Sequence, residues 1–226
     1  MTSHVPAIRE VRIPAGAAAL CGDLCVPAAA SGLVLFAHGS GSGRHSARNR
    51  QVAARLQHAG IATLLFDLLT AQEEQVDVHT REHRFDIPLL TGRMQEATAW
   101  AAAQPELHGL PAGYFGASTG SAAALIAAAR LGHGIKAVVS RGGRPDLAGP
   151  AALAAVLAPT LLIVGDADQA VAELNREAYA RLQCEKRIAI VAGATHLFEE
   201  PGALEQVAEL AADWFTVHLA QLEQSA

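Results

Sequence analysis

One serine of this sequence stands in a pattern that can make its hydroxyl a nucleophile. Gly116, Ser118 and Gly120 form the motif Gly-x-Ser-x-Gly. A short apolar run typical of a buried strand precedes the motif, and small, helix-favouring residues follow it. In this context the motif predicts a sharp turn that strains the serine backbone and lifts its hydroxyl off the sheet edge. The N-terminus of the following helix would place free N–H groups beside that hydroxyl.

The serine needs a base, and His196 is the candidate. A serine hydroxyl is a poor nucleophile until a base removes its proton. His196 follows the last predicted strand, where a loop can bring its ring over the sheet edge. Imidazole in turn needs an acceptor that fixes its tautomer and stabilises its charged form. Asp166 and Asp168 both follow the preceding predicted strand. We favour Asp168, because it stands further from the strand end, and keep Asp166 as the alternative.

The reaction of such a serine also needs two donors for the oxyanion that forms on the attacked carbonyl. The backbone N–H of Thr119, directly after the serine, is the first candidate. The second should come from the Gly-rich loop 38–43, which follows a predicted strand. We name Ser40 as that donor, with Gly41 as the alternative. His38, at the start of this loop, and Gly41 are also candidates for contact with substrate.

The same Gly-rich loop has a second interpretation, as a dinucleotide-binding fingerprint. Gly39 and Gly41 follow a predicted strand and Asp67 ends the next one, as in sites that bind pyrophosphate and ribose. The third glycine of that fingerprint would stand at position 44, which is Arg44. Two predicted strands also precede the loop, whereas the fingerprint usually follows the first strand of its domain. We therefore expect no nucleotide cofactor.

Strands and helices that alternate along the chain would bring these residues together. Besides the strand that leads into the motif, strands are expected over 7–14, 17–26, 33–37, 61–67, 135–140, 159–164 and 187–191. Besides the helix that leaves it, helices are expected over 47–59, 86–103, 146–157, 171–182 and 201–219. This alternation predicts an α/β fold: an open, mostly parallel sheet with helices on both faces, which binds ligands at the carboxyl ends of its strands. The polar segment 68–84 has the length of a short lid, so no large cap domain is expected.

Composition and charge are typical of a compact globular chain with one domain over residues 1–226. Hydrophobic residues make up 51% of the chain, which excludes a disordered protein. The apolar runs are too short to span a membrane, and the formal net charge of −5 disfavours nucleic acid as a partner. The first ten residues lack a signal-peptide pattern and the three cysteines are an odd number, so we expect a cytoplasmic protein without disulfides. Cys21 and Cys25 have no further ligands nearby, and no metal site is expected.

Four motifs resemble, in order and approximate spacing, those of the dienelactone-hydrolase-like group of α/β-hydrolases: His38-Gly39-Ser40-Gly41, Gly116-Ala117-Ser118-Thr119-Gly120, Gly165-x-x-Asp168 and Gly193-Ala194-Thr195-His196. The resemblance covers nearly the whole chain. It implies an α/β-hydrolase fold and a triad of Ser118, Asp168 and His196. Because the acid of that group typically follows Gly-x-x, it is a second reason to prefer Asp168.

The chain departs from this group at the nucleophile. Dienelactone hydrolases proper use cysteine, whereas this motif has Ser118, and Cys184 lies in a predicted helix-to-strand connection that cannot replace it. The resemblance therefore implies a serine carboxylesterase rather than a true dienelactone hydrolase. Some relatives of this type are joined to a phosphoribosyltransferase domain, for which 226 residues are too few.

The predicted function is hydrolysis of small or short-chain esters through an acyl-enzyme intermediate, with a small-molecule ester as partner and no cofactor. Two alternatives stay open. The chain can be a catalytically idle scaffold that acts as a binding module, although the intact Ser–Asp–His order argues against it. It can also act on an anionic lactone, as a dienelactone-hydrolase-like enzyme. The N-terminal strand pair leaves an edge that is a candidate surface for a homodimer.

Several arginines fall at the edge where the predicted strands end: Arg44, Arg48, Arg81, Arg84, Arg141 and Arg144. In an acidic protein they can form a local positive pocket for an anionic substrate, since guanidinium binds carboxylate in a fork. We favour the alternative that they pair with neighbouring acids and hold the loops in place. Among these arginines, Arg141 is the best candidate for contact with substrate, because it is closest to a strand end beside the serine motif.

Overall fold

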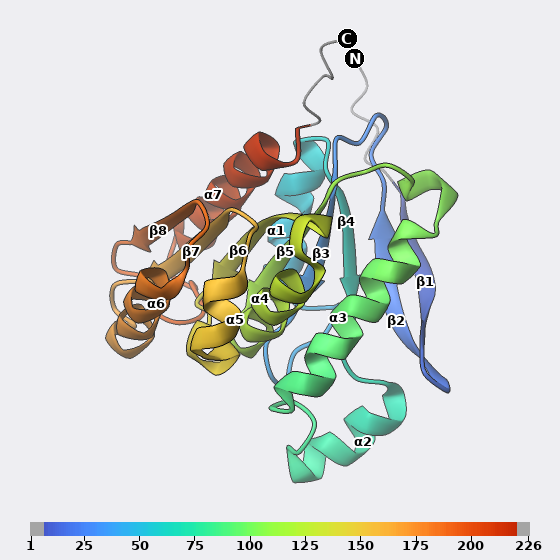
Figure 1. Cartoon of the computed structure of the whole chain (residues 1–226), viewed down its shortest axis with the longest axis horizontal. Helices are drawn as coiled ribbons and strands as arrows, with labels where there is room; N and C mark the ends of the chain where they lie inside the picture. Colours follow the sequence, from blue (N-terminus) through green and yellow to red (C-terminus); the bar gives the residue numbers. More distant parts are fainter. Residues whose placement is uncertain (1–6, 221–226) are drawn as a thin grey trace.

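An eight-stranded sheet runs through the molecule in the order β1-β2-β4-β3-β5-β6-β7-β8 (Figure 1). The structure, a computed structural model, describes residues 7–220. Most of the first ten residues, for which no signal peptide is expected, lie outside the described residues. The strands are β1 (Ile8–Ala15), β2 (Ala18–Cys25), β3 (Leu33–Ala37), β4 (Ala62–Phe66), β5 (Ala112–Ala117), β6 (Ile135–Arg141), β7 (Thr160–Gly165) and β8 (Lys186–Val191).

The sheet is mostly parallel, as the alternation of elements predicts. Only β2 runs antiparallel to its neighbours, β1 and β4, and all other neighbouring strands within residues 7–220 are parallel. The two N-terminal strands form a hairpin, but β1 alone lies at the sheet edge. The other side of β2 is hydrogen-bonded to β4, and its apolar side chains Leu20 and Leu24 are buried in the core.

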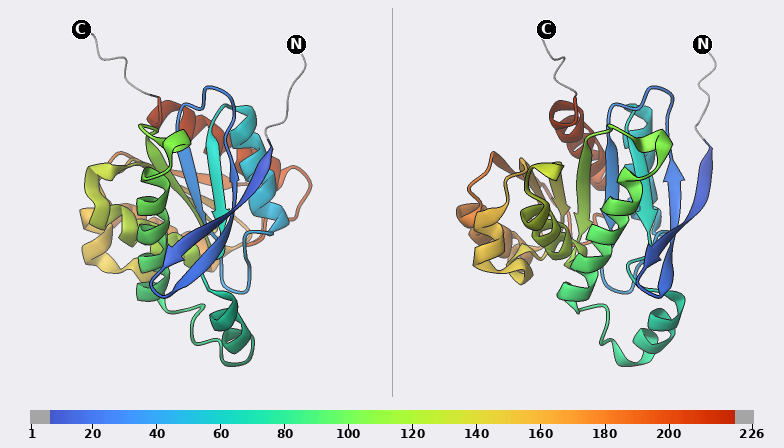
Figure 2. Two further views of the ribbon diagram at one scale, coloured as in Figure 1. Left: turned by 90° about the vertical axis from the view of Figure 1, so that its right-hand side faces the viewer. Right: turned by 45° about the vertical axis from the view of Figure 1, so that its right-hand side comes forward.

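Helices cover both faces of the sheet (Figure 2). The α-helices are α1 (Ala47–His58), α2 (Ala71–Thr80), α3 (Ile87–Ala102), α4 (Thr119–Leu131), α5 (Gly149–Ala155), α6 (Gln169–Arg181) and α7 (Ala203–His218). Helices α1 and α7 pack on one face, whereas α3, α4, α5 and α6 pack on the other. No separate cap domain stands over the sheet in the described part of the chain.

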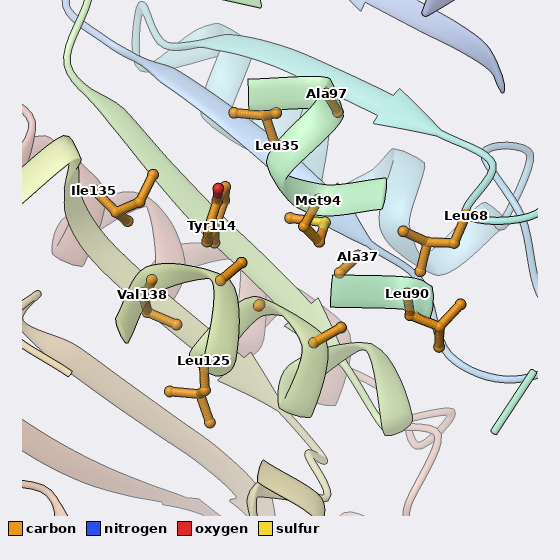
Figure 3. Close-up of a cluster of buried hydrophobic side chains, with 14 of the residues drawn as sticks. Leu35, Ala37, Leu68, Leu90, Met94, Ala97, Tyr114, Leu125, Ile135 and Val138 are labelled. Atoms are coloured by element: carbon orange, nitrogen blue, oxygen red, sulfur yellow. The ribbon is translucent and has the colours of Figure 1, made fainter. Parts of the chain in front are cut away.

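The central strands are apolar throughout because both of their faces are buried. Along β3, Leu35 faces α3 and α4, while Val34 and Phe36 face α1 and α7. A strand with two covered faces shows a continuous apolar run rather than an alternating pattern. Figure 3 shows side chains of the cluster on the α3/α4 face, among them Met94 and Tyr114. This packing fixes the strand ends at which the site is built.

The segment between β4 and α3 holds a helix that was not predicted. Helix α2 begins at Thr70, whose hydroxyl accepts the N–H of Glu73 while the Glu73 carboxylate accepts the N–H of Thr70. This reciprocal arrangement is a capping box, and Thr-x-x-Glu was its signal in the sequence. Figure 1 shows α2 set apart from the other helices, at the edge where β4 ends.

Candidate active site

Ser118 lies on a sharp turn between β5 and α4. Its backbone has φ 49° and ψ −123°, a strained conformation for a residue with a side chain, which persists only where the surroundings enforce it. A Cβ on Gly116 would lie 2.5 Å from Ser121 Cα, and a Cβ on Gly120 would collide with two carbonyl oxygens at the end of β3. The Ser118 N–H donates to the carbonyl oxygen of Arg141 at 3.2 Å. Close packing against β3 and β6 therefore holds the turn.

His196 bridges the serine and a carboxylate. Its Nε2 lies 3.3 Å from Ser118 Oγ, and its Nδ1 lies 2.7 Å from Asp168 Oδ2. The Asp168 contact places the proton on Nδ1, so the lone pair of Nε2 faces the serine hydroxyl. The longer serine distance is typical of a ligand-free site, in which such hydrogen bonds tighten when substrate binds. The structure thus brings together the three residues that sequence order singled out.

Asp166, the alternative acid, has a different position. Its Oδ1 accepts the N–H of Gly193 at 2.6 Å, three residues before His196 in the chain. Directly before Asp166, Gly165 packs so closely that a Cβ there would collide with the carbonyl oxygen of Ala194. The carboxylate of Asp166 therefore ties the loop after β7 to the loop after β8, and it does not contact the His196 ring.

The predicted oxyanion donors, the N–H groups of Thr119 and Ser40, both lie beside the Thr119 hydroxyl. Thr119 begins α4, so its N–H has no acceptor within the helix. The Ser40 N–H donates to Thr119 Oγ1 at 3.0 Å, and a substrate oxygen must displace that hydroxyl to use it. Gly41, the alternative donor, has φ 68° in a turn closed by the Ser42 N–H and the Gly39 carbonyl oxygen at 3.2 Å. A positive φ requires glycine there for its conformation.

Asp67 anchors the Gly-rich loop. Its Oδ1 accepts the backbone N–H of Arg44 at 2.8 Å, and its Oδ2 accepts from Arg44 Nη1 at 2.5 Å. In the dinucleotide interpretation this carboxylate would instead face a ribose. The Asp67 carboxylate is thus engaged within the protein, and Arg44 at position 44 binds this carboxylate and holds the loop in place.

The imidazole of His38 links the loops after β3 and β4. Its Nε2 accepts the N–H of Leu68 at 3.0 Å, and its Nδ1–H donates to the Gly39 carbonyl oxygen at 2.9 Å. Burial lowers the pKa of His38 below its usual range, although the Asp67 and Glu74 carboxylates oppose this shift. Because both ring nitrogens are engaged, His38 supports the Gly-rich loop, in contrast to its predicted contact with substrate.

We expect His38 to make the protein less stable in acid. A histidine whose pKa is lower in the folded state contributes stability above its unfolded pKa of about 6.5, and this is lost as the pH falls through the folded pKa. Chemical denaturation between about pH 8 and pH 5 should show the free energy of unfolding of the wild type falling more than that of His38→Gln, whose amide oxygen can accept the Leu68 N–H without titrating. Equal slopes for the two proteins would contradict this role.

Most arginines at this edge are paired with acids, as expected. Arg44 pairs with Asp67, Arg48 with Glu199, Arg84 with Asp77 and Arg144 with Asp146. The Asp77 carboxylate is buried and also accepts the N–H groups of His83 and Arg84, so this pair closes the segment after α2. Arg141 differs from them, because its guanidinium is buried and makes no ion pair within residues 7–220.

Cys184, the other conceivable nucleophile, lies far from this edge. Its Sγ is 3.7 Å from Oγ1 of Thr160, the residue at which β7 begins. Burial raises the pKa of the Cys184 thiol, which disfavours the reactive thiolate. This thiol therefore cannot replace Ser118.

Ser118 is half-buried, and its two partners reach the surface. The side chain of His196 is 38% exposed and that of Asp168 is 19% exposed. One cavity, of about 870 Å³, lies at the opposite sheet edge among Leu33, Ala112 and Lys136. A second, of about 740 Å³, lies behind the Gly-rich loop. Neither is lined by the serine or the histidine, whereas a small third cavity is lined by Ser40 and Thr119, the two candidate oxyanion donors.

Within residues 7–220, no group of three or more His, Cys, Asp or Glu side chains is arranged to hold a metal ion. None of the helices in the same range is both long and apolar enough to cross a membrane.

Comparison with known proteins decides the family. A model described as the alpha/beta hydrolase domain matches residues 30–215. The chain belongs to the α/β-hydrolases. Among solved structures, this α/β-hydrolase is similar to a dienelactone hydrolase from Anabaena variabilis, with 55% identity, a TM-score of 0.93, and coverage of 95% of this chain and 99% of the other. The predicted dienelactone-hydrolase-like resemblance is confirmed.

Other relatives share less of their length or sequence. Two curated proteins from strains of Mycobacterium tuberculosis, provisionally named phosphoribosyl transferases, are 58% identical over 210 residues. That match covers 93% of this α/β-hydrolase but only 46% of those proteins. Est1E from Butyrivibrio proteoclasticus has 17% identity and a TM-score of 0.79, with coverage of 94% of this chain and 99% of the other. This last likeness shows the fold alone.

Sequence reasoning did not find the contacts that hold the loops of the site. These are the Thr119 hydroxyl on the Ser40 N–H and the Asp166 carboxylate on Gly193. Both depend on how the loops fold back, which residue spacing does not fix. The Arg44–Asp67 pair, by contrast, agrees with the expected pairing of these arginines with neighbouring acids.

Proposed function

We propose that this α/β-hydrolase is a serine carboxylesterase that cleaves small or short-chain esters. The observation that carries the proposal is the contiguous line of Asp168, His196 and Ser118, with Ser118 held in a strained turn at a helix N-terminus. A surface serine with no catalytic role has no need of an oriented imidazole or of backbone strain. Both features favour an enzyme over an idle scaffold.

The reaction follows from this geometry. Nε2 of His196 takes the proton of Ser118 while Oγ attacks the ester carbonyl, and the Asp168 carboxylate stabilises the imidazolium. The N–H groups of Thr119 and Ser40 hold the oxyanion once the Thr119 hydroxyl has moved aside. The imidazolium then gives its proton to the departing alcohol, which leaves an acyl group on Ser118. Water, activated by the same imidazole, releases the acid and restores the serine.

The surroundings of Ser118 favour small acyl groups. Long acyl chains need a deep apolar cavity or a cap to remove them from water, and neither large cavity adjoins Ser118. A second candidate reaction is lactone hydrolysis, favoured by the 55% identity to a protein called dienelactone hydrolase. A lactone is a cyclic ester, so the same residues would open it.

The name of the mycobacterial relatives describes a transfer reaction, but this chain spans less than half of their length. Its own residues form a serine–histidine–aspartate arrangement. We therefore propose hydrolysis for the region shared with those relatives, whatever their remaining residues do.

Covalent labelling tests the proposal. A fluorophosphonate phosphonylates an activated serine and releases fluoride, and intact mass shows the adduct. We expect one adduct on the wild type and none on Ser118→Ala.

Ser121→Ala is the matched control. It should still label, because the wild-type Ser121 hydroxyl is buried in α4. Labelled wild type should lose turnover of p-nitrophenyl acetate and butyrate, and of a small lactone if the second candidate holds. No adduct on the wild type would point to the idle scaffold.

A further inference from the structure

Arg141 is the one arginine of this sheet edge that is buried without a counter-ion in the described structure. Its side chain is only 7% exposed, and its Nε and Nη1 have no hydrogen-bond partner. Burying an ionised group costs free energy that a partner charge normally offsets. The unpaired N–H donors of the Arg141 guanidinium can therefore bind an anion that comes from outside the chain.

The position of Arg141 connects it to the catalytic residues. It ends β6, where it is paired with Ala117 of β5, and its carbonyl oxygen accepts the Ser118 N–H. The next residue, Gly142, packs beneath the histidine, since a Cβ there would lie 3.1 Å from the His196 carbonyl oxygen. The backbone of Arg141 therefore supports the nucleophile, and the residue after it packs against the base.

Its side chain lies on the face of the sheet that α1 and α7 cover. Alternate residues of a strand share a face, and Val139, two residues before Arg141, packs in the cluster beneath α1 and α7. Helix α1 contributes Arg48, whose Nη1 pairs with Glu199 while its Nε is buried without a partner. Next to it, the buried Asn49 also has an unpartnered Oδ1. The buried end of α1 and the end of β6 thus hold unused polar atoms on the same face of the sheet.

The two arginines repel each other. Burial, and then the charge of Arg48, lower the pKa of Arg141 to about 10, so the group is still charged at neutral pH. The pKa of the paired Arg44, by contrast, is raised, because hydrogen bonding and attraction to Asp67 together outweigh desolvation. An anion placed between Arg141 and Arg48 would relieve both the desolvation and the repulsion.

We propose that Arg141, with Arg48 beside it, forms an anion-binding subsite next to the catalytic serine that takes a carboxylate or phosphate group. Both ligands match the planar fork of a guanidinium. The group is either part of the ester substrate or a free anion. The first case rests on the proposed esterase function and makes the enzyme selective for acidic esters, whereas the second does not need that function.

Thermal unfolding tests the subsite without turnover. Inorganic phosphate or succinate at millimolar concentration should raise the Tm of the wild type by about 2 °C or more beyond its effect on Arg141→Met. The general effect of these salts on stability cancels in that comparison. Arg141→Met keeps the aliphatic stem and breaks no recorded hydrogen bond, so it should fold. Arg55→Met is the control, because Arg55 of α1 already pairs with Glu209 of α7, and it should respond to anions like the wild type.

A matched pair of esters identifies the source of the anion. In p-nitrophenyl hemisuccinate, a carboxylate replaces the terminal methyl group of p-nitrophenyl butyrate. We expect the ratio of kcat/KM for hemisuccinate to that for butyrate to fall roughly tenfold or more in Arg141→Met, and to stay at the wild-type value in Arg55→Met. Arg141→Lys, which keeps the charge without the fork, should fall between the wild type and Arg141→Met.

The outcomes separate cleanly. A change of the ester ratio assigns the subsite to the substrate, and a shift of Tm without such a change assigns it to a free anion. Wild type that shows neither response would overturn the proposal. If the enzyme turns over no ester at all, the proposed function fails while the Tm comparison still decides the subsite.

Discussion

Asp168→Asn is expected to hydrolyse p-nitrophenyl butyrate about ten-thousandfold more slowly than the wild type, with most of the loss in kcat. The carboxylate lies 2.7 Å from His196 Nδ1 and only accepts hydrogen bonds, so it holds the proton on Nδ1. An asparagine can turn its NH₂ group toward that nitrogen. The imidazole proton would then move to Nε2, which would face Ser118 as a donor and could no longer act as its base.

Asp166→Asn is the matched control for this experiment. The same substitution, two residues earlier, leaves an amide oxygen that can still accept the Gly193 N–H. We therefore expect a loss of no more than about tenfold, which corresponds to one weakened hydrogen bond. Steady-state kinetics of both variants at one pH would suffice. If Asp166→Asn suffered the larger loss, the assignment of the triad acid would be wrong.

The succession of strands and helices along the chain, the turn at Ser118 and the meeting of its partners could be predicted, because they follow from patterns that α/β sheets share. Continuous apolar runs mark strands with two covered faces, and the carboxyl ends of parallel strands share one edge. His196 and Asp168 could thus be placed near Ser118 before any coordinate was known.

What could not be predicted depends on local geometry that spacing leaves open. Segment 68–84 is polar enough to resemble a lid, yet its capping box at Thr70 and the buried Asp77–Arg84 pair fold it into α2 and a closed turn. His38 stands where a substrate contact is plausible, but the approach of Leu68 engages its ring. In the first case, contacts within the segment decide its conformation. In the second, a hydrogen bond between residues 30 positions apart decides the role of His38.

The close packing at the Ser118 turn also predicts a large loss of stability when Gly120 is replaced. Gly120→Ala should lower the free energy of unfolding by about 3–5 kcal/mol, more than an ordinary overpacking substitution. The added methyl would meet the carbonyl oxygens of Ala37 and His38, and backbone atoms at the end of a buried strand cannot rotate away as a side chain can. Relief requires β3 and α4 to separate, which would also move the Ser40 N–H away from Thr119.

Gly92→Ala provides the control because it makes the same change inside α3, where nothing lies within 4 Å of the added Cβ. There, alanine should stabilise the protein by up to about 1 kcal/mol, since it favours the helix and restricts the unfolded chain. The two Tm values should therefore move in opposite directions, with Gly120→Ala lower by roughly 10 °C. A small effect at position 120 would mean that the turn at Ser118 can relax. The close approach of α4 to β3 would then not be what holds Ser118 in its strained conformation.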